Sequence, residues 1–284
     1  MLPVKIKHIF LTFLLIIFVF EGVSVANIDI VCSPINSKWV IIRNRPSQEN
    51  VILIDVRSSH QYGEIKISNS LNIPLYVIKT KTFLKNENIL LISNGVNLAE
   101  MQVECKKLER LGFKRVKILY GGILAWVGTD GSVEGNSQTL QKLREVNYLD
   151  IYKERFMEDW VMVVVSKKPP PKKIFNLLPC WQIVHLSNGN NFAKSLKRFF
   201  ENNIKNSAKS HRLLFVCPSN LRSEVSKIAL SYNFFTFYFL FGTVEGYIDY
   251  LQLQKRIQEA KKRLDNRHLE NQCSRFPKRC SCGR

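Results

Sequence analysis

The chain alternates short apolar runs with amphipathic stretches. In its first half, continuous apolar runs lie at 51–54, 89–92 and 116–119. Such runs are typical of strands that are buried on both faces of a sheet. Residues 103–111 have helical spacing and end at Gly112, which suits the left-handed C-terminal position of a helix. The order of strand, helix and strand predicts an α/β domain with a mostly parallel central sheet flanked by helices.

The second half repeats this order. Its apolar runs predict strands at 161–165, 183–186, 212–216 and 235–241 and helices at 192–200 and 223–229. The Gly, Ser and Asp residues between Gly128 and Ser137 place a boundary between the halves. The segment from Lys167 to Lys173 contains three consecutive prolines and predicts a stiff, solvated loop. Two α/β domains of one fold are the economical interpretation.

The amino terminus has the pattern of a targeting segment. Lys5 and Lys7 precede an apolar run, and small residues at Ser24 and Ala26 suit cleavage by signal peptidase. The run is shorter than the about 20 residues of a comfortable bilayer span, so a cleaved signal peptide and an uncleaved anchor are the two alternatives. We expect export to a periplasmic or secreted location. The predicted organisation is a signal peptide or anchor at 1–26, domains at 27–130 and 138–254, and a basic tail at 255–284.

Composition narrows the classes of function. The chain has 284 residues, 45% hydrophobic content and a formal charge of +19, which suits an anionic partner or substrate and says nothing about the fold. Seven cysteines in an exported protein leave at least one thiol unpaired or intermolecular. No pair of Cys-x-x-Cys motifs indicates structural zinc, and we expect neither a metal nor a cofactor.

Several motifs of the first half resemble the rhodanese-like (sulfurtransferase) family. They are Ile54-Asp55-Val56-Arg57, Asn72-Ile73-Pro74, Gly112-Phe113, Gly121-Gly122 and Ala125-Trp126. Asp55 and Arg57 are expected to lock a loop beside the sheet, and the paired glycines permit a tight turn. The resemblance implies a Cys after the strand at 89–92, where this sequence has Ser93 followed by Asn94 and Gly95. We therefore expect this domain to be catalytically inactive, with Cys105 as a small core residue.

The second half inverts this pattern. Its opening motifs are eroded, yet the segment from Cys217 to Ser223 resembles the family's active loop, Cys-x-x-Gly-x-Arg-Ser. Cys217, Arg222 and Ser223 match position by position, and Asn220 replaces the glycine, which is tolerable because Asn adopts left-handed conformations more readily than most residues. The resemblance implies tandem rhodanese-like domains, of which only the second carries the cysteine.

This residue set suits sulfur chemistry. A loop that curls from a strand end into a helix start directs backbone N–H groups and the positive helix end at one point, which favours an anion. We expect this field and Arg222 to depress the pKa of a catalytic Cys217. Arg222, Ser219, Asn220 and Ser223 are the expected substrate-binding residues, with Ser223 as the helix cap. The resemblance implies persulfide transfer from an anionic donor such as thiosulfate to cyanide, a small thiol or a protein thiol.

Three alternatives stay open. In the first, Cys217 is an inert strand-end cysteine or a disulfide partner. In the second, the protein is a non-catalytic rhodanese-fold binding or scaffold protein. The third alternative is a cysteine-dependent phosphatase, because Cys-to-Arg loops also bind phosphate. Only four residues separate Cys217 from Arg222, where low-molecular-weight tyrosine phosphatases have five, and the shorter ring crowds a phosphoryl group.

The remaining signals are weaker. Residues 254–271 predict a charged, solvated helix whose basic residues have no interleaved aromatic residues, which disfavours nucleic-acid binding. Membrane contact is expected only through an uncleaved N-terminal segment. We expect Cys273, Cys280 and Cys282 to form disulfides, with Cys32 or Cys180 as a partner. His60 is expected at the surface, and His185 is expected to be structural, with a neighbour role at Cys217 as the alternative.

Overall fold

The computed structural model describes residues 34–35, 51–129, 131–203 and 211–275, and the side chains of the last helix as far as Asp265. All of these residues belong to one compact unit of the chain. The predicted signal peptide or anchor lies outside the described residues, as do Cys32, Cys280 and Cys282. Among the described helices, none combines the length and the apolar character needed to cross a bilayer.

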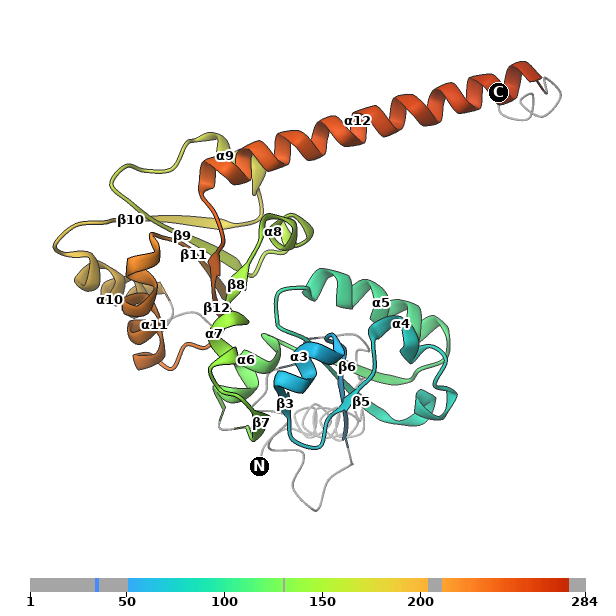
Figure 1. Cartoon of the computed structure of the whole chain (residues 1–284), viewed down its shortest axis with the longest axis horizontal. Helices are drawn as coiled ribbons and strands as arrows, with labels where there is room; N and C mark the ends of the chain where they lie inside the picture. Colours follow the sequence, from blue (N-terminus) through green and yellow to red (C-terminus); the bar gives the residue numbers. More distant parts are fainter. Residues whose placement is uncertain (1–33, 36–50, 130, 204–210, 276–284) are drawn as a thin grey trace, which may run out of the picture. The chain divides into compact units, whose positions relative to one another are not determined.

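The first half builds a five-stranded parallel sheet in the order β1-β6-β5-β2-β4, of which Figure 1 labels β5 and β6. Its strands are β1 (Pro34–Ile35), β2 (Val51–Asp55), β4 (Leu71–Asn72), β5 (Asn88–Ile92) and β6 (Arg115–Leu119). Its helices are α3 (Ser59–Glu64), α4 (Leu75–Ile78), the 3₁₀ helix η1 (Thr82–Asn86), α5 (Leu98–Arg110) and α6 (Gly122–Val127). The parallel pairing of these strands confirms the predicted sheet. Its central strands are those that carry the continuous apolar runs.

The second half builds another five-stranded parallel sheet, in the order β10-β9-β11-β12-β8. Its strands are β8 (Glu145–Val146), β9 (Trp160–Ser166), β10 (Gln182–Ser187), β11 (Arg212–Val216) and β12 (Phe237–Leu240). Its helices are α7 (Thr139–Lys142), α8 (Tyr148–Glu154), α9 (Lys173–Leu177), α10 (Phe192–Asn203), the 3₁₀ helix η2 (Ser219–Leu221), α11 (Arg222–Ser231) and α12 (Val244–Arg275).

The two sheets have the same strand order. Counted along each half from one sheet edge to the other, the order is first, fifth, fourth, second and third strand in both cases. Strand β11 of the second sheet is therefore the equivalent of β5 in the first, and the loops after these two strands occupy equivalent places. The repeat that the sequence pattern predicted is confirmed at the level of topology.

The predicted boundary segment is not a plain linker. Within it, β7 (Val133–Gly135) pairs antiparallel with β3 (Ile65–Ile67), so the chain returns to the first half before it enters the second. Gly135 has a positive φ of 112° beside the carbonyl of Glu64, where a side chain would collide with the backbone. The glycines of this segment therefore serve a two-stranded sheet, which composition alone could not distinguish from a linker.

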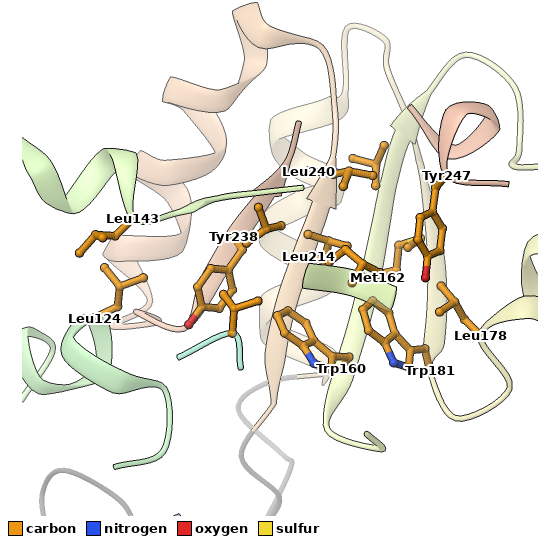
Figure 2. Close-up of a cluster of buried hydrophobic side chains, with 14 of the residues drawn as sticks. Leu124, Leu143, Trp160, Met162, Leu178, Trp181, Leu214, Tyr238, Leu240 and Tyr247 are labelled. Atoms are coloured by element: carbon orange, nitrogen blue, oxygen red, sulfur yellow. The ribbon is translucent and has the colours of Figure 1, made fainter. Parts of the chain in front are cut away.

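One hydrophobic cluster continues from the first half into the second. Leu124 and Trp126 of α6 belong to it together with Trp160, Tyr238 and the other buried side chains of the second sheet. Figure 2 shows part of this cluster, with the indole rings of Trp160 and Trp181 stacked at a centroid distance of 5.1 Å. Aromatic residues bury large apolar areas, so this shared cluster is a main source of the stability of the compact unit.

The Asp55–Arg57 motif folds as the sequence predicted. Both side chains are buried, and Asp55 accepts hydrogen bonds from Arg57 Nη2 at 2.6 Å and from Arg57 Nε at 3.0 and 3.1 Å. Arg57 also donates to the carbonyl of Ile65 at 2.7 Å, and Asn72 donates to the carbonyls of Asp55 and Arg57. This network holds the chain after β2 against the start of β3.

Candidate functional site

Cys217 follows β11, the equivalent of the strand that precedes Ser93 in the first half. Every residue of β11 is buried, and its apolar side chains pack on both faces of the sheet. The cysteine itself is half-buried, packs against the cluster that contains Phe215 and Val225, and has a free thiol. The predicted thiol is therefore reduced and lies where the buried strand meets the surface.

The loop after Cys217 is a short right-handed turn. Pro218 is extended, and Ser219–Leu221 form η2, in which the amide of Leu221 donates to the carbonyl of Pro218 at 3.0 Å. The amide of Arg222 donates to the carbonyl of Ser219. Two of the amides that were expected to point at the sulfur are thus used inside the turn. Asn220 lies within η2, so the left-handed conformation considered for it is not needed.

Helix α11 begins at Arg222, with Leu221 as its N-terminal cap residue. The prediction that Ser223 caps this helix is wrong, because the 3₁₀ turn starts the right-handed coil earlier and leaves Ser223 inside the first turn. Ser219, Asn220 and Ser223 are all exposed. They line the outer side of the turn, and their expected role as substrate-binding residues remains a prediction.

Arg222 is held by two acceptors outside the loop. Its Nη1 donates to Glu145 Oε1 at 2.9 Å, and its Nη2 donates to the carbonyl of Leu240 at 3.1 Å. Its Nε is buried and has no hydrogen-bond partner among the described residues. The guanidinium therefore braces the loop against β8 and β12.

The pKa of Cys217 is raised to about 11, contrary to the predicted depression. Burial of the thiol is the larger cause, because it disfavours the charged thiolate, and the charge of Arg222 only partly opposes it. Arg222 is already neutralised in part by Glu145, which weakens its field at the sulfur. At neutral pH the thiol is therefore mostly protonated in this conformation.

The equivalent loop of the first half is tied to the second half. The carbonyl of Asn94 accepts a hydrogen bond from Tyr238 Oη at 3.2 Å, and the carbonyl of Gly95 accepts one from Arg212 Nη1 at 2.9 Å. Ser93 Oγ accepts from the amide of Gly95 at 3.0 Å. The loop that lacks the cysteine is therefore a structural contact of β11 and β12.

Arg212 is the centre of a buried charged cluster at this contact. Its guanidinium pairs with Glu154 at 2.7 Å, forms two hydrogen bonds of 2.8 Å with Asp159, and lies 4.3 Å from the ring centre of Trp160. Glu154 Oε1 in turn accepts from the amide of Ala99, in the first turn of α5, at 2.8 Å. A carboxylate near a helix N-terminus is stabilised by the helix dipole, so Glu154 fills an anion position of the first half with a side chain of the second.

The carboxylates and the arginine perturb one another. The pKa of Glu154 is raised because the side chain is buried, and the attraction to Arg212 opposes this shift without cancelling it. Hydrogen bonds from Arg212 and Tyr120 hold the pKa of Asp159 below its usual value, although burial acts in the opposite direction. Burial therefore outweighs the attraction of Arg212 at Glu154, whereas the hydrogen bonds and the charge of Arg212 outweigh burial at Asp159.

Sequence reasoning missed these long-range partners. Arg212 is a charged residue at the start of an otherwise apolar strand, and this was the one signal that it is buried and paired. Glu145 and Tyr238 gave no such signal, because nothing in their local pattern shows that they face Arg222 or Asn94. Their contacts span 77 and 144 positions of the chain.

The other predicted residues are placed as follows. Cys105 is buried in the core as expected and is also disulfide-bonded, which the sequence did not indicate. Cys180 has a free thiol, so the suggested disulfide to Cys180 is wrong. His60 is exposed as expected. His185 is half-buried and shares a hydrogen bond with the carbonyl of Ser166 at 3.0 Å, which gives it a structural partner.

Comparison with known proteins identifies the first half. The rhodanese-like domain family matches residues 41–129, and this segment is a rhodanese-like domain. The chain is 36% identical over 93 residues to a protein of Debaryomyces hansenii named adenylyltransferase and sulfurtransferase UBA4. That match covers 29% of this chain and 20% of the relative, so the chain spans about a fifth of the relative's length.

Solved structures give matches of the same kind. A rhodanese-like domain from Anabaena sp. is 21% identical, with a TM-score of 0.33, and the match covers 37% of this chain and 81% of that domain. A Bacillus halodurans protein is 31% identical, with a TM-score of 0.31 and coverage of 36% and 77%. A thiosulfate sulfurtransferase from Pseudomonas aeruginosa is 14% identical, with a TM-score of 0.31 and coverage of 76% and 44%.

Proposed function

We propose that the protein is a sulfurtransferase that carries sulfane sulfur as a persulfide on Cys217. The observation that carries this proposal is the position of a free, half-buried thiol directly after β11, the strand equivalent to β5 of the rhodanese-like domain, with Arg222 at the end of the following turn. The charge of Arg222 acts on the sulfur in the direction that favours the thiolate. The donor is a small oxyanion such as thiosulfate.

The proposed reaction has two balanced steps. The Cys217 thiolate attacks the sulfane sulfur of thiosulfate, a new S–S bond forms, and sulfite leaves with the electron pair of the broken bond. Cyanide or a thiolate acceptor then attacks the terminal sulfur, and the electron pair of the S–S bond returns to Cys217. The proton of the thiol goes to solvent before the first step, so the raised pKa of Cys217 makes this deprotonation an added cost at neutral pH.

The turn after Cys217 supplies the groups proposed to bind the donor. The charge of Arg222 acts on the sulfur of Cys217, and an oxyanion donor would be attracted by the same charge. The exposed side chains of Ser219, Asn220 and Ser223 offer further hydrogen bonds on the outer side of the turn. Charge-assisted hydrogen bonds of this kind are stronger than neutral ones, so Arg222 is expected to contribute most to donor binding.

The test uses intact-mass measurement after treatment of the reduced protein with thiosulfate. We expect the wild type and Cys180→Ser to gain the mass of one sulfur atom at Cys217, and Cys217→Ser to gain none. Cys180 is the matched control because its thiol is the other free one among the described residues. The same three proteins are then assayed for thiocyanate formation from thiosulfate and cyanide. No persulfide on reduced wild type, or equal activity in Cys217→Ser, would refute the proposal.

A non-catalytic binding module is the second candidate, and one observation favours it. The ion pair between Arg222 and Glu145 and the raised pKa of Cys217 together leave the thiol mostly protonated at rest. A chain that binds a partner without reaction would show no persulfide in the mass experiment. An aryl phosphate assay in parallel tests the phosphatase alternative, and turnover that depends on Cys217 there would replace sulfur transfer as the function.

We also propose that the protein acts in an exported, oxidising compartment. The disulfide at Cys105 supports this placement, because stable disulfides are rare in the reducing cytosol. The basic and apolar pattern of the first 26 residues points the same way. Mapping the N-terminus and the thiols of the protein from its native compartment tests the placement. An intact N-terminus together with a reduced Cys105 would contradict it.

A further inference from the structure

Among its described side chains, helix α12 packs against the second half between Val244 and Gln258. Leu251 is buried in the shared core cluster, and Gln258 Nε2 donates to Tyr152 Oη of α8 at 2.6 Å. Every residue from 255 to 265 is exposed. The predicted charged helix at 254–271 is therefore the continuation of a longer helix that begins at Val244 (Figure 1). Over residues 255–265 its surface is available to another molecule.

The apolar residues of this exposed part follow a single line along the helix. The exposed members are Leu253, Ile257, Ala260 and Leu264, at successive spacings of four, three and four residues. Tyr250, three residues before Leu253, continues the line into the part of the helix that is packed against the core cluster. This is the a and d spacing of a coiled coil, in which apolar side chains form a narrow seam that packs on a second helix. Leu253, Ile257 and Leu264 are 48%, 38% and 58% exposed. Exposed apolar residues that are scattered singly are normal, whereas a contiguous line of them indicates an interaction site.

Positive charge flanks this seam on both sides. With about 100° between successive residues of a helix, Arg256 and Arg263 lie along one border of the seam and Lys261 along the other. The acidic residues of this stretch, Glu259 and Asp265, are turned farther away from it. In a coiled coil, charges at these border positions determine which helix binds, because they face the border positions of the second helix.

Two other binding partners of the seam, a second copy of this helix and a membrane surface, are disfavoured. A second copy of this helix would place Arg256 against Lys261 in a parallel pair, and basic borders would also meet in an antiparallel pair, so self-association is repulsive. A membrane surface suits a wide apolar face with Trp or Phe. This seam is narrow, includes Ala260, and contains neither Trp nor Phe.

We propose that α12 between Leu253 and Leu264 is a docking surface for an amphipathic helix of a partner protein, with apolar residues along one seam and Asp or Glu at its borders. Burial of Leu253, Ile257 and Leu264 supplies the affinity. The pairing of acidic borders with Arg256, Lys261 and Arg263 supplies the choice of partner. This surface is separate from the Cys217 turn and does not depend on sulfur transfer.

The test uses two synthetic probes and the full-length chain. One probe is a four-heptad helical peptide with Leu at the a and d positions and Glu at the borders, and the other carries Lys at the borders. Fluorescence anisotropy is expected to show at least tenfold tighter binding of the Glu peptide, and this preference is expected to weaken as salt is raised. Ile257→Asp with Leu264→Asp is expected to abolish binding, because it places charge in the seam.

A charge reversal with a matched control separates the seam from general basicity. Arg256→Glu with Lys261→Glu is expected to reverse the preference, so that the Lys peptide binds more tightly. Lys255→Glu with Lys262→Glu changes the net charge equally on the opposite side of the helix and is expected to keep the wild-type preference. Equal effects of the two double variants would overturn the proposal, because they would show attraction by net charge alone.

Three further outcomes would also overturn it. The first is the absence of binding to either peptide by a folded wild type. The second is sedimentation of the wild type as a dimer that Ile257→Asp with Leu264→Asp converts to a monomer, which would make the seam a self-association surface. The third is binding to phosphatidylserine vesicles without any preference between the peptides, which would make it a membrane surface.

Discussion

Arg212 and Glu154 form an ion pair of 2.7 Å in which both side chains are completely buried. The pair joins β11 to the end of α8, and Glu154 extends the link to the amide of Ala99 in the first half. Buried ion pairs cost desolvation energy that only good geometry repays. At Glu154, the attraction to Arg212 therefore only partly offsets the cost of burying the carboxylate charge.

The pH dependence of unfolding is expected to report Glu154. Because its pKa is raised in the folded state, the folded protein holds this proton more tightly than the unfolded chain does. The resulting stabilisation is present below the unfolded pKa and is lost as the pH rises through the folded pKa. We expect Glu154→Gln to lose less stability than the wild type between acidic and neutral pH, measured by urea unfolding. Parallel pH curves for the two proteins would contradict this assignment.

Release of Arg222 is expected to activate Cys217. In Glu145→Gln the guanidinium loses its paired charge, so its field at the sulfur increases and the pKa of Cys217 falls from about 11. The rate of alkylation by iodoacetamide against pH measures this pKa, because only the thiolate reacts. Arg222→Met is expected to shift the curve in the opposite direction. Identical curves for Glu145→Gln and wild type would show that the ion pair does not control the thiol.

Gly95 is expected to resist substitution. Its φ is 88°, and a Cβ there would collide with the hydroxyl of Tyr238 and the carbonyl of Gly121. Overpacking and an unfavourable backbone conformation together predict a loss of about 1–3 kcal/mol in the free energy of unfolding for Gly95→Ala. Gly189→Ala is the control, because a Cβ there meets nothing within 4 Å, and its expected change is within about 0.5 kcal/mol. Equal denaturation midpoints would remove the argument for close packing at Gly95.

The Asp55–Arg57 pair is expected to be far more important for stability than surface pairs. Arg57→Ala leaves the buried charge of Asp55 without its main partner, which predicts a loss of about 3–5 kcal/mol. The pair of Lys66 and Glu134 is the control, because its side chains are 36% and 53% exposed, and Lys66→Ala is expected to cost about 1 kcal/mol or less. Denaturant unfolding of both variants tests this difference, and similar losses would contradict it.

The sequence was sufficient for the parts of the fold that rest on local patterns. Strands such as β5 and β9 are buried on both faces, so their apolar runs mark them directly. The Asp55–Arg57 lock was also predictable, because its two residues are two positions apart. The equivalence of the loops after β5 and β11 followed from the repeated order of the elements, which fixes their place in each sheet.

The electrostatics of the site could not be predicted in the same way. The motif around Cys217 shows which residues are near the sulfur, but the sign of its pKa shift depends on burial and on Glu145, which is distant in sequence. The helix cap was misplaced because a 3₁₀ turn and an α-helix have similar sequence preferences over so few residues. The buried cluster of Arg212, Glu154 and Asp159 requires the packing of both halves.

Arg212 and Tyr238 donate hydrogen bonds to the loop at Asn94 and Gly95. Because of these bonds, the second half depends on the first half for its folded structure. A fragment cut between the halves would retain Arg212, Glu154 and Asp159 but lose the carbonyls and the amide that now complete their bonding. The isolated second half is thus expected to unfold or to aggregate, whatever reaction Cys217 catalyses. Any chimaera that borrows this thiol has to bring the chain around residues 94–99 with it.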